Sequence, residues 1–434
     1  MNRDNIDNIF LYACRNGYLF LAKLLLLIKP DISIHTEYAF TMVCECGHLE
    51  IAKWLLDANP QIIISNRIFS EVCHNGHLNV AKWLLQIEPS IDIHIRDDDF
   101  FRWVCVNGHL NIAQWLLEIK PTINISANGE DAFTCSCNNG HLDIAKWLLE
   151  IKPDIDISID NEYAFRRACS NGHLKIAQWL LEIKPDIDIS AKDEYAFRRA
   201  CSGGHLNVAK WLLEIKHDID ISIDNEYIFK NVCFYGHLNV AKWLLQMKPT
   251  IDISADGEYA FMMACHHGHL SIAQWLFQMK PTINISAYNE DAFRVACSNG
   301  YLNVAKWLLQ IKPTIDISAL DEDAFRVACY KRDLNVAQWL VSLRPDKYKI
   351  TSLNGNGRSF SYEIIKSLNI VGTKHFSETE TCPICCVSDC EVMTCCNHSY
   401  CTTCISSWLD ANHSSCPTCR NNIENTEFRK LVVA

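Results

Sequence analysis

Residues 193–217 read DEYAFRRACSGGHLNVAKWLLEIKH, and close variants of this stretch recur from the start of the chain to about residue 345. One glycine marks the same place in ten copies: Gly17, Gly47, Gly76, Gly108, Gly140, Gly172, Gly204, Gly236, Gly268 and Gly300. Arg332 takes this place in the last copy, so the intervals of 30, 29 and then always 32 residues define eleven repeats. A fixed period of this size is typical of a solenoid, whose units bury their apolar faces by stacking.

Each repeat is predicted to form two short helices followed by an extended arm. Phe197 and Cys201 lie four residues apart on one apolar face, and Gly204 supplies the left-handed residue that ends the first helix. The second helix is expected over Leu206–Ile215, with a proline after it in most repeats. An Asn, Asp or Gly such as Asn161 is expected to cap the first helix. The alternating Asp-Ile-Asp-Ile-Ser between repeats predicts an extended arm or hairpin.

This unit resembles the ankyrin repeat, and NGHLxVAKWLL is its most specific part. The period of 32 differs from the usual period of about 33, and EYAF and KPDIDIS replace the usual TPLH and GADVNA. The variant is similar to the ankyrin proteins that giant DNA viruses encode in large numbers. The resemblance implies a mainly α-helical solenoid over residues 1–345 that binds proteins. Tetratricopeptide or HEAT-type helical pairs are the alternative, although their periods and their lack of a β-like arm fit less well.

The ankyrin resemblance places the first helices and the loop tips on the concave groove, so binding residues are expected where the first helices differ between repeats. Repeats six and seven carry four arginines there, in a chain whose net charge is −11. The predicted substrate-binding residues are Trp103, Arg166, Arg167, Arg198, Arg199, Asn231 and Met263. They indicate a surface for an acidic and apolar segment of a protein substrate. The alternative is a solvated face with salt bridges to the loop aspartates.

The other conspicuous repeated residues are interpreted as architecture. Ten tryptophans, from Trp54 to Trp339, occur once per repeat in repeats two to eleven, at a predicted core position of the second helix. The turn histidines are expected to bond the neighbouring repeat and not a metal. Atypical first and last repeats predict polar caps. The 29-residue interval predicts one shortened loop near Asn59–Arg67.

A second motif lies near the C-terminus, where eight residues of the types that bind zinc follow one another: Cys382, Cys385, Cys396, His398, Cys401, Cys404, Cys416 and Cys419. Zinc takes four such ligands tetrahedrally, so the series predicts two closed, structural zinc sites. A segment of this size buries too little apolar surface to fold alone, and metal supplies the missing stability. Cys395 competes with Cys396 as the third ligand. An unrelated cysteine-rich scaffold or a plain zinc knuckle is the alternative.

The order of three cysteines, one histidine and four cysteines resembles the RING finger family. The resemblance implies that Cys382, Cys385, Cys401 and Cys404 hold one zinc ion and the other four ligands hold the second. It also implies that Ile384, Trp408 and Pro417 form a groove for a ubiquitin-conjugating enzyme (E2), and that Arg420 contacts both E2 and ubiquitin. The expected function is a RING-type E3 ubiquitin ligase without a covalent catalytic residue. The alternative is a non-enzymatic adaptor with a structural zinc module.

The predicted organisation is a solenoid over residues 1–345, a linker over 346–379, the RING finger over 380–423 and a tail over 424–434. The linker is expected to contain a short helix over Tyr362–Leu368. The tail is apolar enough to pack on the zinc module or to pair two modules in a dimer.

The net charge, the length of the apolar runs and the distribution of cysteines indicate which partners and which cellular compartment to expect. The acidic charge disfavours nucleic acid and anionic membranes as main partners. The run Tyr18–Ile28 is too short to span a bilayer, and the N-terminus lacks the features of a secretory signal. Eleven of the 23 cysteines recur once per repeat and ten lie between Cys382 and Cys419, which argues against a disulfide framework. A reducing compartment is expected, cytoplasmic or nuclear, in the host cell if the protein is viral.

Overall fold

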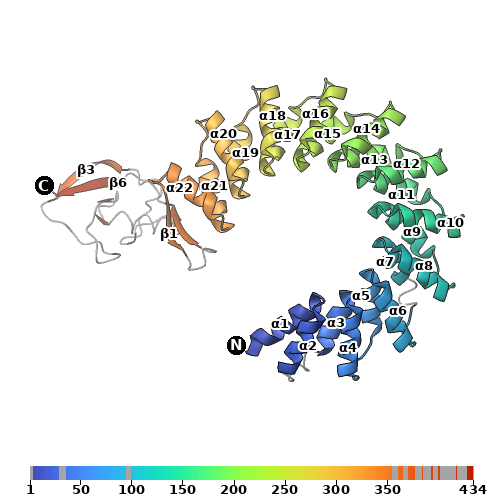
Figure 1. Ribbon diagram of the computed structural model, residues 1–434. Coiled ribbons are helices and arrows are strands. Elements are labelled where there is room, and N and C mark those ends of the chain that lie inside the picture. The colour runs from blue at the N-terminus through green and yellow to red at the C-terminus, as the bar shows by residue number, and fades with distance from the viewer. Residues whose placement is uncertain are drawn as a thin grey trace. The chain divides into compact units, whose positions relative to one another are not determined.

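A computed structural model describes residues 3–28, 36–93 and 99–353 of the chain and shorter pieces after them: 360–364, 370–376, 384, 392–393, 399–400, 417 and 428–433. The chain forms two units, Met1–Asp252 and Ile253–Ala434. Helices α1 to α22 follow one another as eleven pairs, one for each sequence repeat (Figure 1). The predicted number of repeats and the mainly helical solenoid are therefore confirmed.

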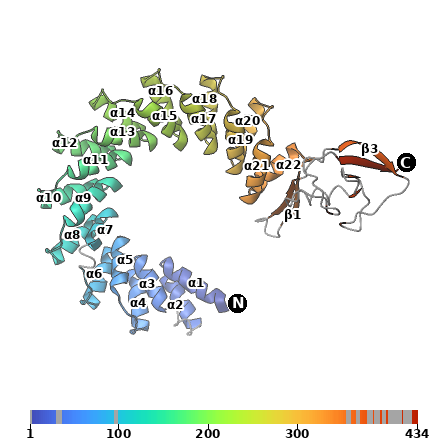
Figure 2. The same ribbon diagram turned by 180° about the vertical axis from the view of Figure 1, so that it is seen from behind.

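The first unit holds eight helix pairs. Their first helices are α1 (Arg3–Arg15), α3 (Thr36–Glu45), α5 (Asn66–His74), α7 (Asp99–Val106), α9 (Ala127–Asn139), α11 (Ile159–Ser170), α13 (Ala191–Ser202) and α15 (Ile223–Tyr235). Their second helices are α2 (Leu19–Ile28), α4 (Leu49–Ala58), α6 (Leu78–Ile87), α8 (Leu110–Ile119), α10 (Leu142–Ile151), α12 (Leu174–Ile183), α14 (Leu206–Ile215) and α16 (Leu238–Met247). Within this unit the first helices line the inner side of the stack and the second helices line its outer side (Figures 1 and 2).

Aromatic pairs join each repeat to the next one. The ring of Phe165 lies 6.3 Å from Trp211 of the following repeat, and the Phe197 and Trp243 rings lie 6.2 Å apart. Both phenylalanines are fully buried. An aromatic pair of this geometry contributes about 0.5–1.5 kcal/mol beyond the area that it buries. The tryptophans therefore pack between repeats as predicted, but only Trp115 and Trp243 are buried and the other repeat tryptophans are partly exposed.

The turn between the two helices depends on a glycine and a histidine of successive repeats. Gly47 has a φ of +80°, and a Cβ added to it would lie 2.4 Å from the ring of His77. The histidine rings in turn bond the preceding repeat: His48 Nε2 lies 2.9 Å from the Arg15 carbonyl oxygen, and His141 Nε2 lies 3.0 Å from that of Val106. The predicted structural role of the turn histidines is confirmed for these residues.

Burial also fixes the charge state of several turn histidines. Desolvation lowers the pKa of four of them below the ordinary value, and this outweighs the carbonyl contacts that raise it: His77, His173, His205 and His237. The neutral ring keeps one nitrogen as a donor and one as an acceptor. These four residues, the half-buried turn histidines, are therefore neutral at pH 7.

The segment between repeats differs from the predicted extended arm. Over residues 120–126, 152–158 and their counterparts in later repeats the structure forms turns and no strand. Ile155 is buried, whereas the Asp156 carboxylate accepts a hydrogen bond of 3.0 Å from the Ser158 backbone N–H. The alternation of isoleucine and aspartate thus reflects one core contact and one tight turn. The prediction of a strand-like arm is wrong for this reason.

Among the described residues, a left-handed turn lies within the first few residues of the first helix in seven repeats. Asp160, Asn161 and Glu162 have φ values of 51°, 55° and 62°, and right-handed helix follows them. The Glu162 N–H donates to the Ser158 carbonyl at 3.1 Å, and Ser158 Oγ donates to the Glu162 carboxylate at 2.8 Å. Asn161 therefore lies inside the left-handed turn and does not cap the helix as predicted. Left-handed backbone costs about 1–2 kcal/mol per residue for most side chains, so these contacts offset strain.

Repeat three lacks the left-handed turn. Ser65 caps α5 directly, with an extended backbone (φ −95°, ψ 157°), and its Oγ accepts a hydrogen bond of 3.4 Å from the Ile68 N–H. The interval of 29 residues before Gly76 is three residues shorter than the later ones, which matches the length of the missing turn. The predicted shortened loop is confirmed.

The first repeat does not have the expected polar cap. Phe20 and Leu27 of α2 are 82% and 80% exposed. The equivalent positions of α14 hold Asn207 and Glu214, which are exposed polar residues. The polar cap was predicted from the turn and the core positions of repeat one. The exposed face of the second helix depends instead on the positions of Phe20 and Leu27.

The second unit continues the array and ends in β-strands. Its helices are α17 (Ala255–His266), α18 (Leu270–Met279), α19 (Ala287–Ser298), α20 (Leu302–Ile311), α21 (Ala319–Tyr330) and α22 (Leu334–Leu343). Strands β1 (Tyr348–Leu353) and β2 (Phe360–Ile364) pair antiparallel. A four-stranded sheet has the order β3–β6–β4–β5, formed by Ile370–Phe376, Phe428–Val433, Val392–Met393 and Ser399–Tyr400.

Tyr348, at the start of β1, closes the end of the helical array. It is 1% exposed, and its ring stacks on Phe325 with the ring centroids 4.2 Å apart. Its hydroxyl donates to the Glu322 carboxylate, which also pairs with Lys347. Tyr348 thus packs on Phe325 in the way that a tryptophan of the following repeat packs on the earlier phenylalanines. The cap includes residues that the sequence assigned to the linker.

The predicted helix over Tyr362–Leu368 is wrong, because β2 covers 360–364 and pairs with β1. Tyr362 and Ile364 alternate with polar residues, which suits a strand better than a helix. The C-terminal strand β6 lies between β3 and β4, so both of its edges are occupied within the chain. The pairing of β6 with β4 is a contact of the tail with the 380–423 segment, and the pairing of two modules in a dimer stays a prediction.

Candidate protein-binding surface

Arginine and tyrosine side chains gather on three neighbouring inner helices of the first unit, α11, α13 and α15. We call this set the arginine–tyrosine ladder; it consists of Tyr163, Arg166, Arg167, Tyr195, Arg198, Arg199 and Tyr227. Guanidinium groups lie over ring faces along it, for example Arg167 at 5.7 Å from the Tyr163 centroid and Arg199 at 5.6 Å from the Tyr195 centroid. Tyr, Trp and Arg are the residue types that dominate protein interfaces energetically.

Arg166 is a structural member of this set. It is only 3% exposed. Its Nε donates to the Asn161 carbonyl oxygen at 2.6 Å and its terminal nitrogen donates to the Asp160 carbonyl oxygen at 2.8 Å. The guanidinium therefore satisfies the carbonyls of the left-handed turn. Arg166 was predicted to bind substrate, and that prediction is wrong because the side chain is committed inside its own repeat.

Arg167 and Arg199 meet at the hydroxyl of Tyr195. Burial raises the pKa of Tyr195, but hydrogen bonding to Arg199 and then to Arg167 outweighs it, and the net shift is downward. The same hydrogen bond, which Arg199 donates to the Tyr195 hydroxyl oxygen, raises the pKa of Arg199. Arg167 also donates from Nε to Asn138 Oδ1 at 2.9 Å. Two cations from successive repeats thus favour negative charge at one point of the surface.

Arg198 is half-buried and holds the next left-handed turn more loosely than Arg166 does. Its terminal nitrogen donates to the Lys192 carbonyl oxygen at 3.1 Å, and its guanidinium lies 5.7 Å from the Tyr227 centroid. Its Nε is buried without a hydrogen-bond partner. The prediction that Arg198 lies on the binding side is compatible with this position.

The remaining predicted binding residues are dispersed. Trp103 of α7 is exposed, with the Arg102 guanidinium 5.9 Å from its ring centroid. The Asn231 amide nitrogen of α15 donates to the Tyr227 carbonyl oxygen at 2.8 Å. Met263 of α17 is half-buried and belongs to the second unit. Asn231 is thus bonded to a residue of the ladder, and the roles of Trp103, Asn231 and Met263 in binding stay predictions.

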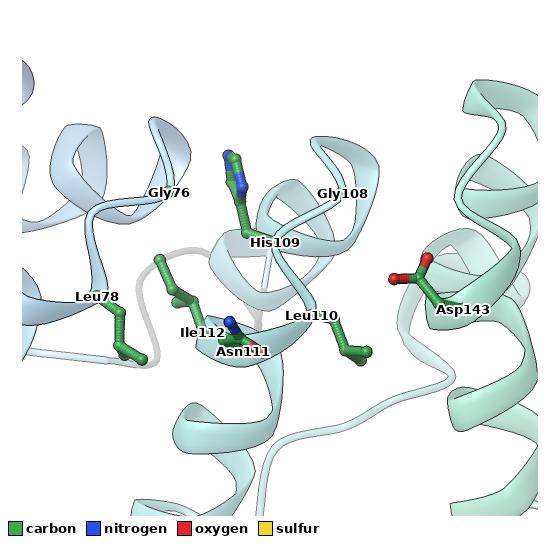
Figure 3. Close-up of a pocket in the computed structure, with 8 residues that line it drawn as sticks. All are labelled: Gly76, Leu78, Gly108, His109, Leu110, Asn111, Ile112 and Asp143. Carbon is green, nitrogen blue, oxygen red and sulfur yellow. The ribbon is translucent and has the colours of Figure 1, made fainter.

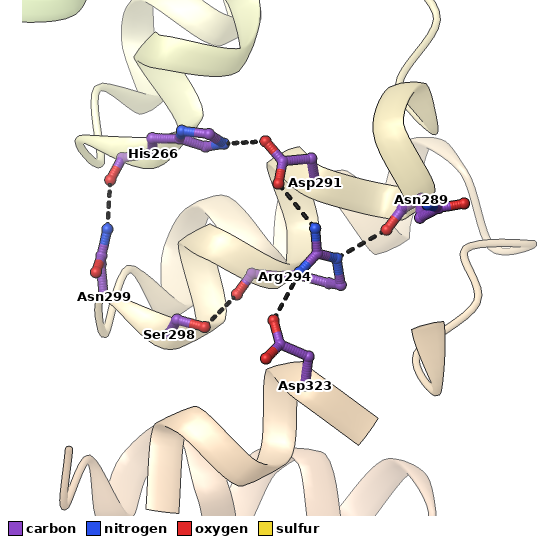
Figure 4. Close-up of polar contacts among 7 residues, drawn as sticks. All are labelled: His266, Asn289, Asp291, Arg294, Ser298, Asn299 and Asp323. Carbon is purple, nitrogen blue, oxygen red and sulfur yellow. Dashed lines mark hydrogen bonds and ion pairs between the residues drawn. The ribbon is translucent and has the colours of Figure 1, made fainter. Parts of the chain in front are cut away.

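In the second unit, the arginine at the corresponding helix position pairs with aspartate side chains. Arg294 of α19 pairs with Asp291 at 2.8 Å and with Asp323 of α21 at 2.6 Å (Figure 4). Asp291 also lies 2.8 Å from His266 Nε2, whose pKa burial lowers in spite of the carboxylate. Figure 4 shows the His266 ring directed at this carboxylate. A carboxylate thus joins arginines and histidines of neighbouring repeats here.

A hollow among the described residues is small. It has a volume of about 250 Å³ and lies beside the turns of repeats three to five, on the second-helix side (Figure 3). Of its lining residues, only His109 and Asp143 have titratable side chains, and His109 Nε2 is engaged 2.8 Å from the His74 carbonyl oxygen. Binding pockets for small ligands are usually larger, at about 300–1,000 Å³. This hollow is therefore not assigned a chemical role.

The repeat cysteines are core residues. All eleven are free and buried, and burial raises the pKa of Cys14 and Cys44 to about 12. A thiol with so high a pKa is a poor nucleophile at neutral pH. Within the described residues no three metal-capable side chains converge, and no helix has the length and hydropathy needed to cross a membrane.

The predicted zinc ligands all lie outside the described residues, as do Trp408 and Arg420. Of the predicted E2-docking residues, Ile384 is 42% exposed and Pro417 is half-buried. The zinc sites and the docking groove therefore stay predictions.

The fold and the inner surface define a helical repeat protein of the class that binds other proteins. A family model described as ankyrin repeats in three copies matches overlapping segments that cover more than half of the chain: residues 10–97, 69–161, 101–193, 153–225 and 229–321. The chain belongs to the ankyrin-repeat family, and a protein–protein interaction scaffold is its general function.

Solved structures with some likeness are also ankyrin proteins. The ankyrin repeat domain of human ASB11 is 17% identical, with 48% of this chain and 96% of that chain covered and a TM-score of 0.36. An ankyrin repeat family protein from Legionella pneumophila is 22% identical, with 58% and 82% covered and a TM-score of 0.30. Likeness at this level carries no argument about function. No curated protein matches the chain.

Proposed function

We propose that the chain is a RING-type E3 ubiquitin ligase in which the ankyrin array binds a protein substrate. The observation that supports the ligase is the ordered series of eight zinc-type ligands between Cys382 and Cys419, which follows the array in the same chain. The donor set of seven cysteines and one histidine suits two closed zinc sites. Zinc would hold the small module together and would take no part in bond making.

Docking of an E2 is proposed for Ile384, Trp408 and Pro417, with Arg420 beside them. The exposure of Ile384 supports this assignment, because an exposed isoleucine on a small module is an apolar contact available to a partner. The forked guanidinium of Arg420 can hydrogen-bond two backbones at once, which suits a residue that contacts both E2 and ubiquitin.

The proposed reaction needs no nucleophile from this chain. The amine of a substrate lysine attacks the ubiquitin carbonyl of the E2 thioester, an isopeptide bond forms, and the E2 cysteine leaves as a thiol. Holding the thioester in a reactive orientation lowers the barrier by proximity alone. The ankyrin array supplies the substrate at high effective concentration, so the segment between the array and the zinc module determines which lysines are reached.

The test is self-ubiquitination by the zinc-loaded full chain with E1, ubiquitin and a panel of E2 enzymes. Chains of ubiquitin that disappear in Ile384→Ala and in Arg420→Ala would support the ligase. Ile63→Ala is the matched control for the first variant, because Ile63 is an exposed isoleucine of the array. Absence of ubiquitin transfer with every E2 would favour the non-enzymatic adaptor. A reducing compartment, cytosol or nucleus, is part of the same proposal and agrees with free cysteines in the array.

A further inference from the structure

Arginines that directly follow the core phenylalanine of their repeat meet carboxylates in several repeats, and Arg166 of the ladder does so too, at 4.0 Å from Asp160. Arg102 lies 3.8 Å from Asp131, and Arg326 lies 3.1 Å from Asp321. Arg294 has two aspartates. Among the residues that the structure describes, Arg167, Arg198 and Arg199 have no carboxylate partner. The ladder is thus a local excess of positive charge in a chain of net charge −11.

The sequence explains the difference. Asp291 and Asp323 hold the helix position that Tyr163, Tyr195 and Tyr227 hold in repeats six to eight. In the second unit Asp291 lies between Arg294 and His266 of the preceding repeat, and Asp323 pairs with Arg294, as Figure 4 shows. In the ladder the tyrosine puts a ring and a neutral hydroxyl there. The carboxylate that the scaffold itself supplies in repeats ten and eleven is therefore missing in repeats six to eight.

We propose that Arg167 and Arg199 together bind an aspartate or glutamate side chain of an extended segment of a partner protein. The carboxylate replaces the Tyr195 hydroxyl as the acceptor between the two guanidiniums, and the faces of Tyr195 and Tyr227 pack along the segment. Arg199 and Tyr227 are exposed and Arg167 is half-buried, so the groups are accessible from the inner side of the first unit. A guanidinium pairs with a carboxylate through parallel, charge-assisted hydrogen bonds. This inference deepens the protein-binding part of the proposed function and is independent of the ligase part.

The test uses the full chain and a fluorescein-labelled peptide in which three glutamates alternate with glycines. Fluorescence anisotropy should show saturable binding that weakens as salt is raised. The same peptide with glutamine in place of glutamate should bind at least about tenfold more weakly, as expected for the loss of a charge-assisted contact. Equal binding of the two peptides would overturn the proposal.

Variants locate the site. Arg167→Glu/Arg199→Glu should weaken binding at least about tenfold, and the neutral pair Arg167→Gln/Arg199→Gln should weaken it by a smaller factor. Lys175→Glu/Lys210→Glu is the matched control, because it changes the charge equally in the same two repeats but on the second helices. An equal loss in this control would overturn the site, and circular dichroism shows whether each variant is folded.

Two further outcomes are decisive. Tighter binding of a phosphoserine peptide than of the glutamate peptide would contradict a carboxylate site. Ubiquitin transfer without peptide binding would refute this inference and leave the ligase standing, whereas peptide binding without ubiquitin transfer would do the reverse.

Discussion

Replacement of Arg166 by alanine tests whether the left-handed turns are held by buried guanidiniums. The side chain makes two hydrogen bonds, of 2.6 and 2.8 Å, to the carbonyls of Asn161 and Asp160, and it is shielded from solvent. A hydrogen bond that involves a charged group contributes about 1.5–3 kcal/mol, and a buried carbonyl left unpaired adds a penalty. The expected destabilisation of this repeat is about 3 kcal/mol.

Arg198→Ala is the matched control, because Arg198 holds the equivalent position in the next repeat with one bond of 3.1 Å. The expected loss there is about 1 kcal/mol. Stability in a repeat array is local, so amide hydrogen exchange is the suitable assay. Peptides that cover Ile159–Ser170 should lose protection by about a hundredfold in Arg166→Ala, because each 1.4 kcal/mol is about tenfold.

The comparison can fail in two ways. Equal losses of protection in the two variants would show that burial and the second hydrogen bond add nothing. Unchanged exchange of α11 in Arg166→Ala would show that the turn does not need the guanidinium. Arg166→Lys should recover less than half of the protection, since an ammonium group cannot donate to both carbonyls in the same geometry.

Three further outcomes are expected. The pKa of the half-buried turn histidines lies below the ordinary 6.5, so the unfolded chain binds more protons in acid, and the Tm should fall as the pH is lowered from about 7.5 to about 5.5; His173→Asn should reduce the fall, and an unchanged slope would refute the assignment. Tyr348→Ala should destabilise α21 and α22 by about 3–4 kcal/mol and Tyr348→Phe by about 1 kcal/mol, measured by hydrogen exchange, whereas equal effects would exclude a role for the bond to Glu322. Leu320 is exposed with a φ of 53°, so Leu320→Gly should be neutral or stabilising by up to about 1 kcal/mol in urea titrations, whereas Gln338→Gly in right-handed helix should cost about 1 kcal/mol; equal costs would contradict the left-handed conformation.

Periodic features of the sequence predicted the array well. The glycine interval gave the number of helix pairs, and the spacing of Phe197, Cys201 and Trp211 identified core positions that are buried or partly buried in the structure. Such features are repeated many times, so every copy carries the same information. The three-residue deficit before Gly76 was also readable, because it interrupts that period.

Features that depend on backbone conformation or on a neighbouring repeat were not predictable in the same way. Alternation in Asp-Ile-Asp-Ile-Ser is equally compatible with a strand and with the observed turns, and nothing in Asp160 or Glu162 indicates left-handed backbone. The burial of Arg166 depends on that backbone, so Arg166 and Arg167 looked alike in the sequence. The change from aspartate to tyrosine beside the arginines was the available signal for the ladder, because it replaces a carboxylate next to the arginines by an aromatic ring.

The ligase proposal depends most on the eight-residue ligand series, since E2 docking needs a folded zinc module. The direct measurement is the zinc content of the purified, folded full chain after exchange into metal-free buffer. Two zinc ions per chain are expected, and one should be lost in Cys382→Ser and one in Cys419→Ser if the two ligand sets are separate. Fewer than two zinc ions in the unmutated chain would contradict the account, and the ankyrin array would then remain a protein-binding scaffold without the proposed activity.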